Sequence, residues 1–174
     1  LDRPGEGSIT VDGGRPAFDT LAFVDMLRRI SETAIGIFGS APYKDYTYIY
    51  AGTGGGLEHL NSTTIGINLE RMAENPRVHQ GVTAHEFFHT WNVKQLKPAG
   101  LTPYDYTKEN YTSELWIAEG GTSYYDGLML TRTGQMSVED FFKEITAGVD
   151  DELRRPGNKV QSVADSSFDA WVKF

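Results

Sequence analysis

The chain contains no cysteine in its 174 residues, and this absence excludes disulfides and thiolate metal sites. A metal ion would therefore have to bind through histidine and carboxylate groups. No apolar run approaches the roughly 20 residues that span a bilayer. Leu1 is not followed by the basic start and apolar block of a signal peptide. These absences predict a soluble chain without a membrane span, but they do not indicate its compartment.

The charge balance excludes a further class of partner. The formal net charge is −8, and four histidines are too few to change its sign, so no nucleic-acid partner is expected. An acidic surface mildly attracts cationic partners, among them peptides with a free amino group. The length and a hydrophobic fraction of 39% suit one domain, or slightly more, with its own core.

Hydrophobic periodicity predicts both helices and strands. Asp19 can cap a helix over residues 20–38, and Gly39 is a natural stop. The other expected elements are two strands that pair with each other, at 46–50 and 63–67, and helices at 78–97, at 114–132 and from the Met136–Phe141 region to about Leu153. This order indicates an α+β fold in which the helix at 78–97 lies between a small sheet and a helical part.

The most informative segment is HEFFH, an instance of the HExxH pattern that begins at His85. On a helix, residues four apart lie one above the other, so His85 and His89 can both present imidazole nitrogens to one zinc ion. Glu86 lies about 100° round the helix and can reach a water molecule on that metal. The alternative is an ordinary helix face whose histidines are solvated or satisfied within the core.

A third ligand is needed, because catalytic zinc usually takes three protein ligands and leaves a fourth position for water. Glu119 lies in the middle of the apolar segment LWIAEGGTSYY, where an unpaired carboxylate would be unfavourable to bury unless a metal bound it. Gly120 and Gly121 each weaken a helix by about 1 kcal/mol relative to alanine. Close approach of two helices around a metal would justify them. A surface charge or a helix cap is the alternative reading of Glu119.

HEFFHTWN followed by LWIAEGGTSYY resembles the glycyl aminopeptidase family of zinc metallopeptidases, which is related to aminopeptidase N and thermolysin. WIAEG is similar to the WLNEG of aminopeptidase N. The resemblance covers roughly residues 18–174 and implies a thermolysin-like zincin catalytic domain. It implies His85, His89 and Glu119 as zinc ligands and Glu86 as general base.

A glycine-rich stretch, GGGLEH, precedes the zinc helix. It is similar to the glycine–x–methionine–glutamate–asparagine motif of aminopeptidase N, with Leu57 in place of methionine and His59 in place of asparagine. The resemblance implies that Glu58 binds the free α-amine of the substrate. Gly55 and Gly56 would let the backbone approach an extended peptide. The alternative is a glycine-rich hairpin loop with an exposed glutamate.

Residues that support the metal ligands are also expected, because metal-bound histidines usually donate their second N–H to an oriented acceptor. Ser123 lies four residues after Glu119 on the same helix face and could be that acceptor, as could Glu109 or Asp126. His59 and His79 are expected to be surface residues or such supporting donors. The large aromatic residues of this region are expected to belong to the core rather than to a substrate pocket: Trp91, Trp116, Tyr124 and Tyr125.

A donor to the developing oxyanion is harder to find. The resemblance to aminopeptidase N implies a tyrosine in a Tyr-x-Lys-Gly helix downstream of the zinc glutamate, and no such sequence follows Glu119. Tyr111, Tyr124 or Tyr125 would have to replace it. Neither end of the chain shows a start or stop signal, so an excised fragment is expected, weakly active and prone to self-association. Residues 1–17 would be a loop or the remnant of a preceding domain, with a short strand near Ile9–Val11.

The sequence thus predicts a zinc-dependent aminopeptidase that removes N-terminal residues from peptides, with its catalytic domain over residues 18–174. Three alternatives stay open. A zinc endopeptidase would make no use of Glu58 in binding. A zinc-stabilised binding domain would lack activity, although it would have no need of Glu86. A helical domain without metal would leave the HExxH pattern without a role.

Overall fold

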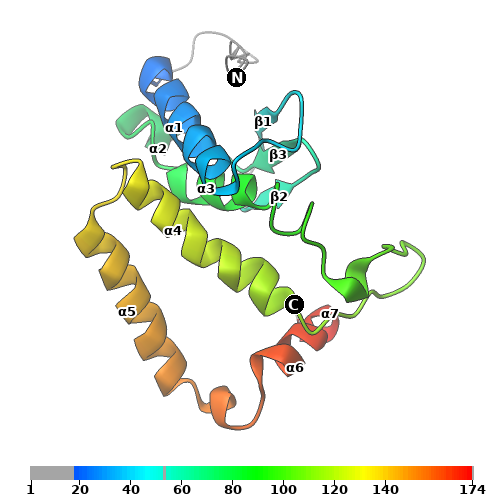
Figure 1. Cartoon of the computed structure of the whole chain (residues 1–174). Coiled ribbons are helices and arrows are strands. Elements are labelled where there is room, and N and C mark those ends of the chain that lie inside the picture. The colour runs from blue at the N-terminus through cyan, green and yellow to red at the C-terminus, as the bar shows by residue number, and fades with distance from the viewer. Residues whose placement is uncertain (1–17, 53, 174) are drawn as a thin grey trace.

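The computed structural model describes residues 18–52 and 54–173 as an α+β arrangement in which a small sheet lies at one side of a mostly helical chain (Figure 1). The strand expected near Ile9–Val11 lies outside the described residues. The α-helices and strands are α1 (Thr20–Phe38), β1 (Thr47–Tyr50), β2 (Gly56–Glu58), β3 (Ser62–Ile65), α2 (Leu69–Glu74), α3 (Gln80–Phe88), α4 (Thr122–Arg132), α5 (Val138–Arg154), α6 (Val163–Phe168) and α7 (Ala170–Lys173). Shorter turns of helix are η1 (Ala99–Leu101), η2 (Trp116–Gly121) and η3 (Pro156–Lys159).

The first helix confirms the prediction from periodicity. The Asp19 carboxylate accepts hydrogen bonds from the backbone N–H groups of Leu21 and Ala22, each at 3.0 Å. Gly39 ends the helix in the left-handed conformation, with φ of 81°. The buried side chains recur at three and four residues along one face: Phe23, Met26, Ile30 and Ala34.

The sheet has three strands in the order β1-β3-β2. The predicted pairing of the first and last of these strands is confirmed, and it is parallel. The stretch from Gly56 to Glu58 was not among the predicted strands, but it forms β2, antiparallel to β3, with Gly56 opposite Ile65. A three-residue strand of glycine, leucine and glutamate carries no local strand signal, so only pairing with β3 decides it.

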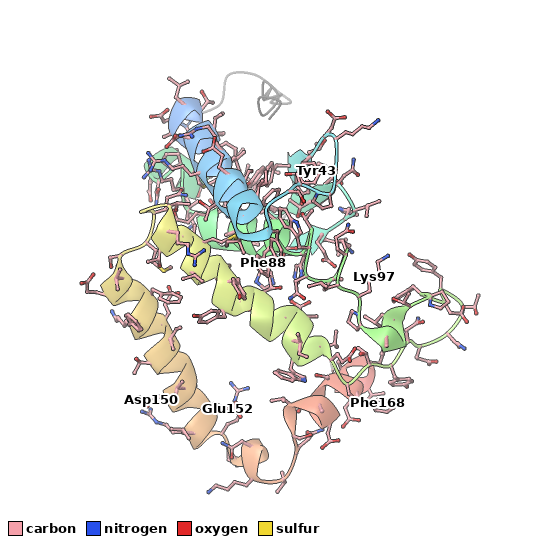
Figure 2. All side chains as sticks on the ribbon, in the orientation of Figure 1. Tyr43, Phe88, Lys97, Asp150, Glu152 and Phe168 are labelled. Atoms are coloured by element: carbon pink, nitrogen blue, oxygen red, sulfur yellow. The ribbon has the colours of Figure 1, made fainter. Side chains whose placement is uncertain are left out.

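Helix α3 lies at the centre and packs against α1, α4, β2 and β3. Phe87 and Phe88 are buried and face different neighbours. Phe87 packs against Tyr46, directly before β1, and Tyr48 of β1, with ring centroids 4.8 and 5.6 Å away. Phe88 of α3 stacks on Tyr125 of α4, with ring centroids 4.7 Å apart. Figure 2 labels Phe88 between α3 and α4. The motif helix is therefore held from two sides.

Two predicted helix boundaries are wrong. The motif helix was expected to reach residue 97, but α3 ends at Phe88 and the chain continues in turns. Trp91 lies in these turns and packs on Phe38 of α1, and Leu96 is exposed. The helix expected over 114–132 begins instead with a π-helical segment, η2, which leads into α4.

Helix α5 extends away from this centre, and α6 comes back to contact η2 (Figure 1). The Ser137 hydroxyl caps α5 by accepting from the Asp140 backbone N–H at 3.0 Å, which confirms the expected cap region. Phe141 of α5 packs against Gly127 of α4, where a β-carbon would lie 3.0 Å from its ring. The helices α2, α6 and α7 are short and were not predicted. No helix among the described residues is long and apolar enough to cross a membrane.

Candidate metal centre

Two histidines and a glutamate from α3 and its end form the base of the site. The His85 and His89 rings are neighbours, with centroids 4.8 Å apart. His89 is the residue that follows α3, and its side chain is only 2% exposed. Glu86 is also buried. The one-turn spacing of the HExxH pattern thus places both imidazoles on the same side of α3.

Glu119 approaches the same two histidines from η2. Its Oε2 lies 3.3 Å from Nε2 of His85 and 3.5 Å from Nε2 of His89. A tetrahedral zinc ion with ligands at about 2.0–2.1 Å holds its donor atoms roughly 3.3–3.4 Å apart. The donor types and their separations therefore fit a zinc ion. The Glu119 side chain is 60% exposed, so it borders open space and does not lie in the core.

The other nitrogen of each histidine is already engaged. His85 Nδ1 lies 3.0 Å from the Asp126 carboxylate, and His89 Nδ1 lies 2.9 Å from the backbone carbonyl of Asn92. In a neutral imidazole whose proton is on Nδ1, the Nε2 lone pair is available to a metal ion. In the protonated imidazolium both nitrogens carry protons, and Nε2 donates to Glu119. Of the three acceptors considered from the sequence, Asp126 takes this place. Ser123 is exposed on α4 and makes no such contact.

Asn92 has a second function that the sequence did not reveal. Its side-chain amide donates to the backbone carbonyls of Ile117 and Ala118, at 3.1 and 3.0 Å, and to the Thr122 hydroxyl at 3.0 Å. The two carbonyls precede Glu119 within the π-helical segment, and Thr122 begins α4 directly after that segment. Asn92 thus fixes the segment that carries Glu119 to the end of the helix that carries the histidines.

The two glycines after Glu119 do not have the predicted reason. A β-carbon on Gly120 would meet nothing within 4 Å, and one on Gly121 would make only an ordinary contact, at 3.6 Å, with Asn92. Close approach of two helices is therefore absent at these positions. Nothing in the structure explains Gly120.

Gly56 is required by a close approach of a different kind. A β-carbon at this position would overlap the carboxylate of Glu86. The edge strand β2 therefore passes directly over the predicted general base. Burial raises the pKa of Glu86, and the positive charges of His85 and His89 oppose that rise. A carboxylate with a raised pKa is suited to accept and return a proton near neutral pH.

The electrostatics of the ligand set favour an ionised Glu119. Hydrogen bonds from His85 and His89 lower the pKa of its carboxyl to about 2. Burial lowers the pKa of His85, but hydrogen bonds to Asp126 and Glu119 outweigh burial and raise it to about 10. A divalent cation would replace the hydrogen bonds of His85 and His89 to Glu119 with direct bonds from all three side chains to the metal.

Glu58 lies at the other side of the group. One ligand atom from each of Glu58, Glu86 and His89 lies within 4.8 Å of the others. The Glu58 carboxylate also accepts from the Lys94 ammonium group at 3.1 Å. Gly55 precedes β2 with φ of 64°, a conformation that favours glycine, and its carbonyl accepts from the Gly66 N–H at 2.9 Å.

Three of the four aromatic residues assigned to the core take other positions than expected, whereas His59 lies at the surface as one of the two expected outcomes. Trp91 is buried, as predicted, but the other three aromatics assigned to the core are partly exposed: Trp116 at 49%, Tyr124 at 49% and Tyr125 at 37%. His59 is exposed, and His79 Nε2 accepts from the Asn68 backbone N–H at 3.2 Å. Tyr111 stacks on Phe168 of α6.

Comparison with known proteins places this geometry in a family. A sequence profile of the M61 glycyl aminopeptidase family matches residues 79–174, more than half of the chain. The chain belongs to the M61 glycyl aminopeptidase family. The matched residues of this family member include α3, η2 and α4, which carry the histidines, both glutamates of the metal group and Asp126.

A solved structure of an aminopeptidase N family protein from Idiomarina loihiensis is similar to this M61 chain over most of its length. The sequence identity is 37% and the TM-score is 0.83, over 92% of this chain and 29% of the other. The chain therefore spans less than a third of that relative. No curated protein matches.

Proposed function

We propose that this M61 family member is a zinc-dependent aminopeptidase whose catalytic centre is His85, Glu86, His89 and Glu119. The observation that carries the proposal is the convergence of three donor atoms, His85 Nε2, His89 Nε2 and Glu119 Oε2, at 3.3 and 3.5 Å, with the buried Glu86 beside them. Residues 18–174 would form part of a thermolysin-like catalytic domain, with α3 between the sheet and the later helices.

Each protein group has a defined part in the proposed reaction. Zinc, when bound, would supply a Lewis acid that polarises the peptide carbonyl and lowers the pKa of water to about 7. Glu86 accepts the proton of the attacking water on its carboxylate and later donates it to the nitrogen of the leaving amine. Asp126 and the Asn92 carbonyl hold the two imidazoles in orientation.

The exopeptidase part of the proposal rests on Glu58. Its position beside Glu86 and His89 supports a role in holding the α-ammonium of the substrate one residue before the cleaved bond. An ammonium group near a divalent cation needs a carboxylate to offset the repulsion. The backbone of β2, an edge strand of the sheet, can pair with an extended peptide.

The test compares free and N-acetylated versions of the same short peptides, with the protein zinc-loaded and after removal of metal by a chelator. We expect much faster cleavage of the free-amine peptide than of the acetylated one, loss of cleavage without metal, and recovery when zinc is restored. Equal cleavage of the acetylated peptide would indicate an endopeptidase. Full activity in the chelated protein would overturn zinc dependence.

A further inference from the structure

The ammonium group of Lys94 forms an ion pair with Glu58. Glu58 is the carboxylate to which the proposed function assigns the substrate amine. Lys94 Nζ lies 3.1 Å from Glu58 Oε1. Both side chains are largely sheltered, with Lys94 24% exposed and Glu58 22% exposed. The pair joins residues 36 positions apart, from β2 and from the turn after α3, so it is a contact of the folded site and not of neighbouring residues.

The backbone around Lys94 fixes this arrangement. Lys94 N–H donates to the His89 carbonyl at 3.1 Å. Val93, directly before it, has φ of 115°. A β-branched residue rarely adopts a positive φ, and such a conformation persists only where the surrounding contacts impose it. The Val93 N–H donates to the Leu96 carbonyl at 3.2 Å, which closes the turn.

The same turn serves the metal ligands. Asn92, two residues before Lys94, accepts from His89 through its carbonyl and holds the Glu119 segment through its amide. The three consecutive residues Asn92 to Lys94 thus connect His89 and the segment that carries Glu119 to Glu58. Placement of Lys94 is therefore coupled to the assembly of the whole site.

A lysine ammonium and the α-ammonium of a peptide are the same chemical group, each with three N–H donors and one positive charge. Both would make the same contacts with Glu58. We propose that Lys94 is a specificity-determining residue that competes with the α-amine of the substrate for Glu58, and so limits how strongly a free amino terminus is bound. This inference rests on the proposed aminopeptidase function and names a residue that regulates the same site.

The competition has a defined consequence for substrate choice. A substrate amine must displace Lys94 from Glu58 or share the carboxylate with it against charge repulsion, which weakens binding of free-amine ligands. A ligand with an acetylated amine carries no charge there and has nothing to displace. Removing Lys94 should therefore increase the preference for free amines, by about two- to fivefold, the range typical of partly exposed ion pairs.

The experiment measures binding of glycinamide and N-acetylglycinamide to the zinc-loaded chain by calorimetry. We expect Lys94→Met to bind glycinamide about two- to fivefold more tightly than the unmodified chain does, with N-acetylglycinamide unchanged. Lys94→Arg keeps the charge and should behave like the unmodified chain. Lys97→Met changes an exposed lysine three residues further on and is the matched control (Figure 2). With an amino-acid nitroanilide, Lys94→Met should lower KM and leave kcat within about twofold.

The outcomes separate the two hypotheses. The aminopeptidase proposal is overturned if neither the unmodified chain nor Lys94→Met binds glycinamide better than N-acetylglycinamide. A chain that prefers glycinamide, with equal or weaker binding by Lys94→Met, overturns only the Lys94 inference. Lys94→Gln, which keeps a donor but no charge, is the second variant. Loss of zinc or of folding in both neutral variants would make Lys94 a structural residue and would also overturn the inference.

Discussion

The Asp126 carboxylate lies 3.0 Å from Nδ1 of His85, and this contact joins α4 to α3 at the centre of the site. Asp126 lies seven residues beyond Glu119, two turns along the same continuous helical segment. One segment therefore supplies both a metal-ligand candidate and the group that orients a second one. The rotation of this helical segment about its axis therefore decides whether Glu119 and Asp126 both reach His85.

Replacing Asp126 with alanine should weaken zinc binding about 10- to 100-fold, because His85 loses the acceptor that fixes its ring and tautomer. Competition with a chromogenic chelator measures this change. Ser123→Ala is the matched control on α4 and should leave affinity unchanged. Equal affinity in the Asp126 variant would mean that the contact does not orient a ligand.

Replacing Glu119 with alanine should remove most of the bound zinc, because only two protein ligands remain. Metal analysis of the purified variant tests this, with the exposed Glu109→Ala as control. Full zinc occupancy in the Glu119 variant would exclude it as a ligand.

Replacing Glu86 with glutamine should leave zinc content and thermal stability almost unchanged, because the side chain is nearly isosteric. The cleavage rate should fall by at least about 10²- to 10⁴-fold, because glutamine cannot accept the proton. Turnover near that of the unmodified enzyme would place the general base elsewhere.

Replacing Gly56 with alanine should displace Glu86, since the new methyl group would overlap its carboxylate. We expect a loss of activity on the order of 10²-fold, the effect of misplacing a catalytic group by about 1 Å. Gly81→Ala is the control, because its β-carbon meets nothing within 4 Å in α3. It should stabilise the helix by about 0.5–1 kcal/mol in denaturant unfolding. Normal activity in Gly56→Ala would show that β2 yields without moving Glu86.

Replacing Glu58 with alanine should reduce cleavage of free-amine peptides much more than cleavage of N-acetylated ones. The reason is the loss of the carboxylate that offsets the charge of the α-ammonium. Steady-state rates on matched peptide pairs measure the ratio. Similar losses on both would assign Glu58 a structural role.

Several features of the protein follow from the sequence alone. The caps Asp19 and Gly39, the periodicity of α1, and the strands around Tyr48 and Thr64 are local signals, and each was predicted correctly. The HExxH pattern is also local, because helical geometry alone brings residues four apart onto one face. Residue types and short spacings therefore determine the elements and name the chemistry.

Only the tertiary structure decided how the site is assembled. Asp126 rather than Ser123 meets His85, since the π-helical turn and the packing of α4 on α3 set which side chains point inward. Lys94 meets Glu58 because a strained turn replaces the end of the predicted helix. Gly56 lies over Glu86 because β2 pairs with β3. Each of these contacts joins residues at least 30 positions apart, and local propensity carries no information about such distances.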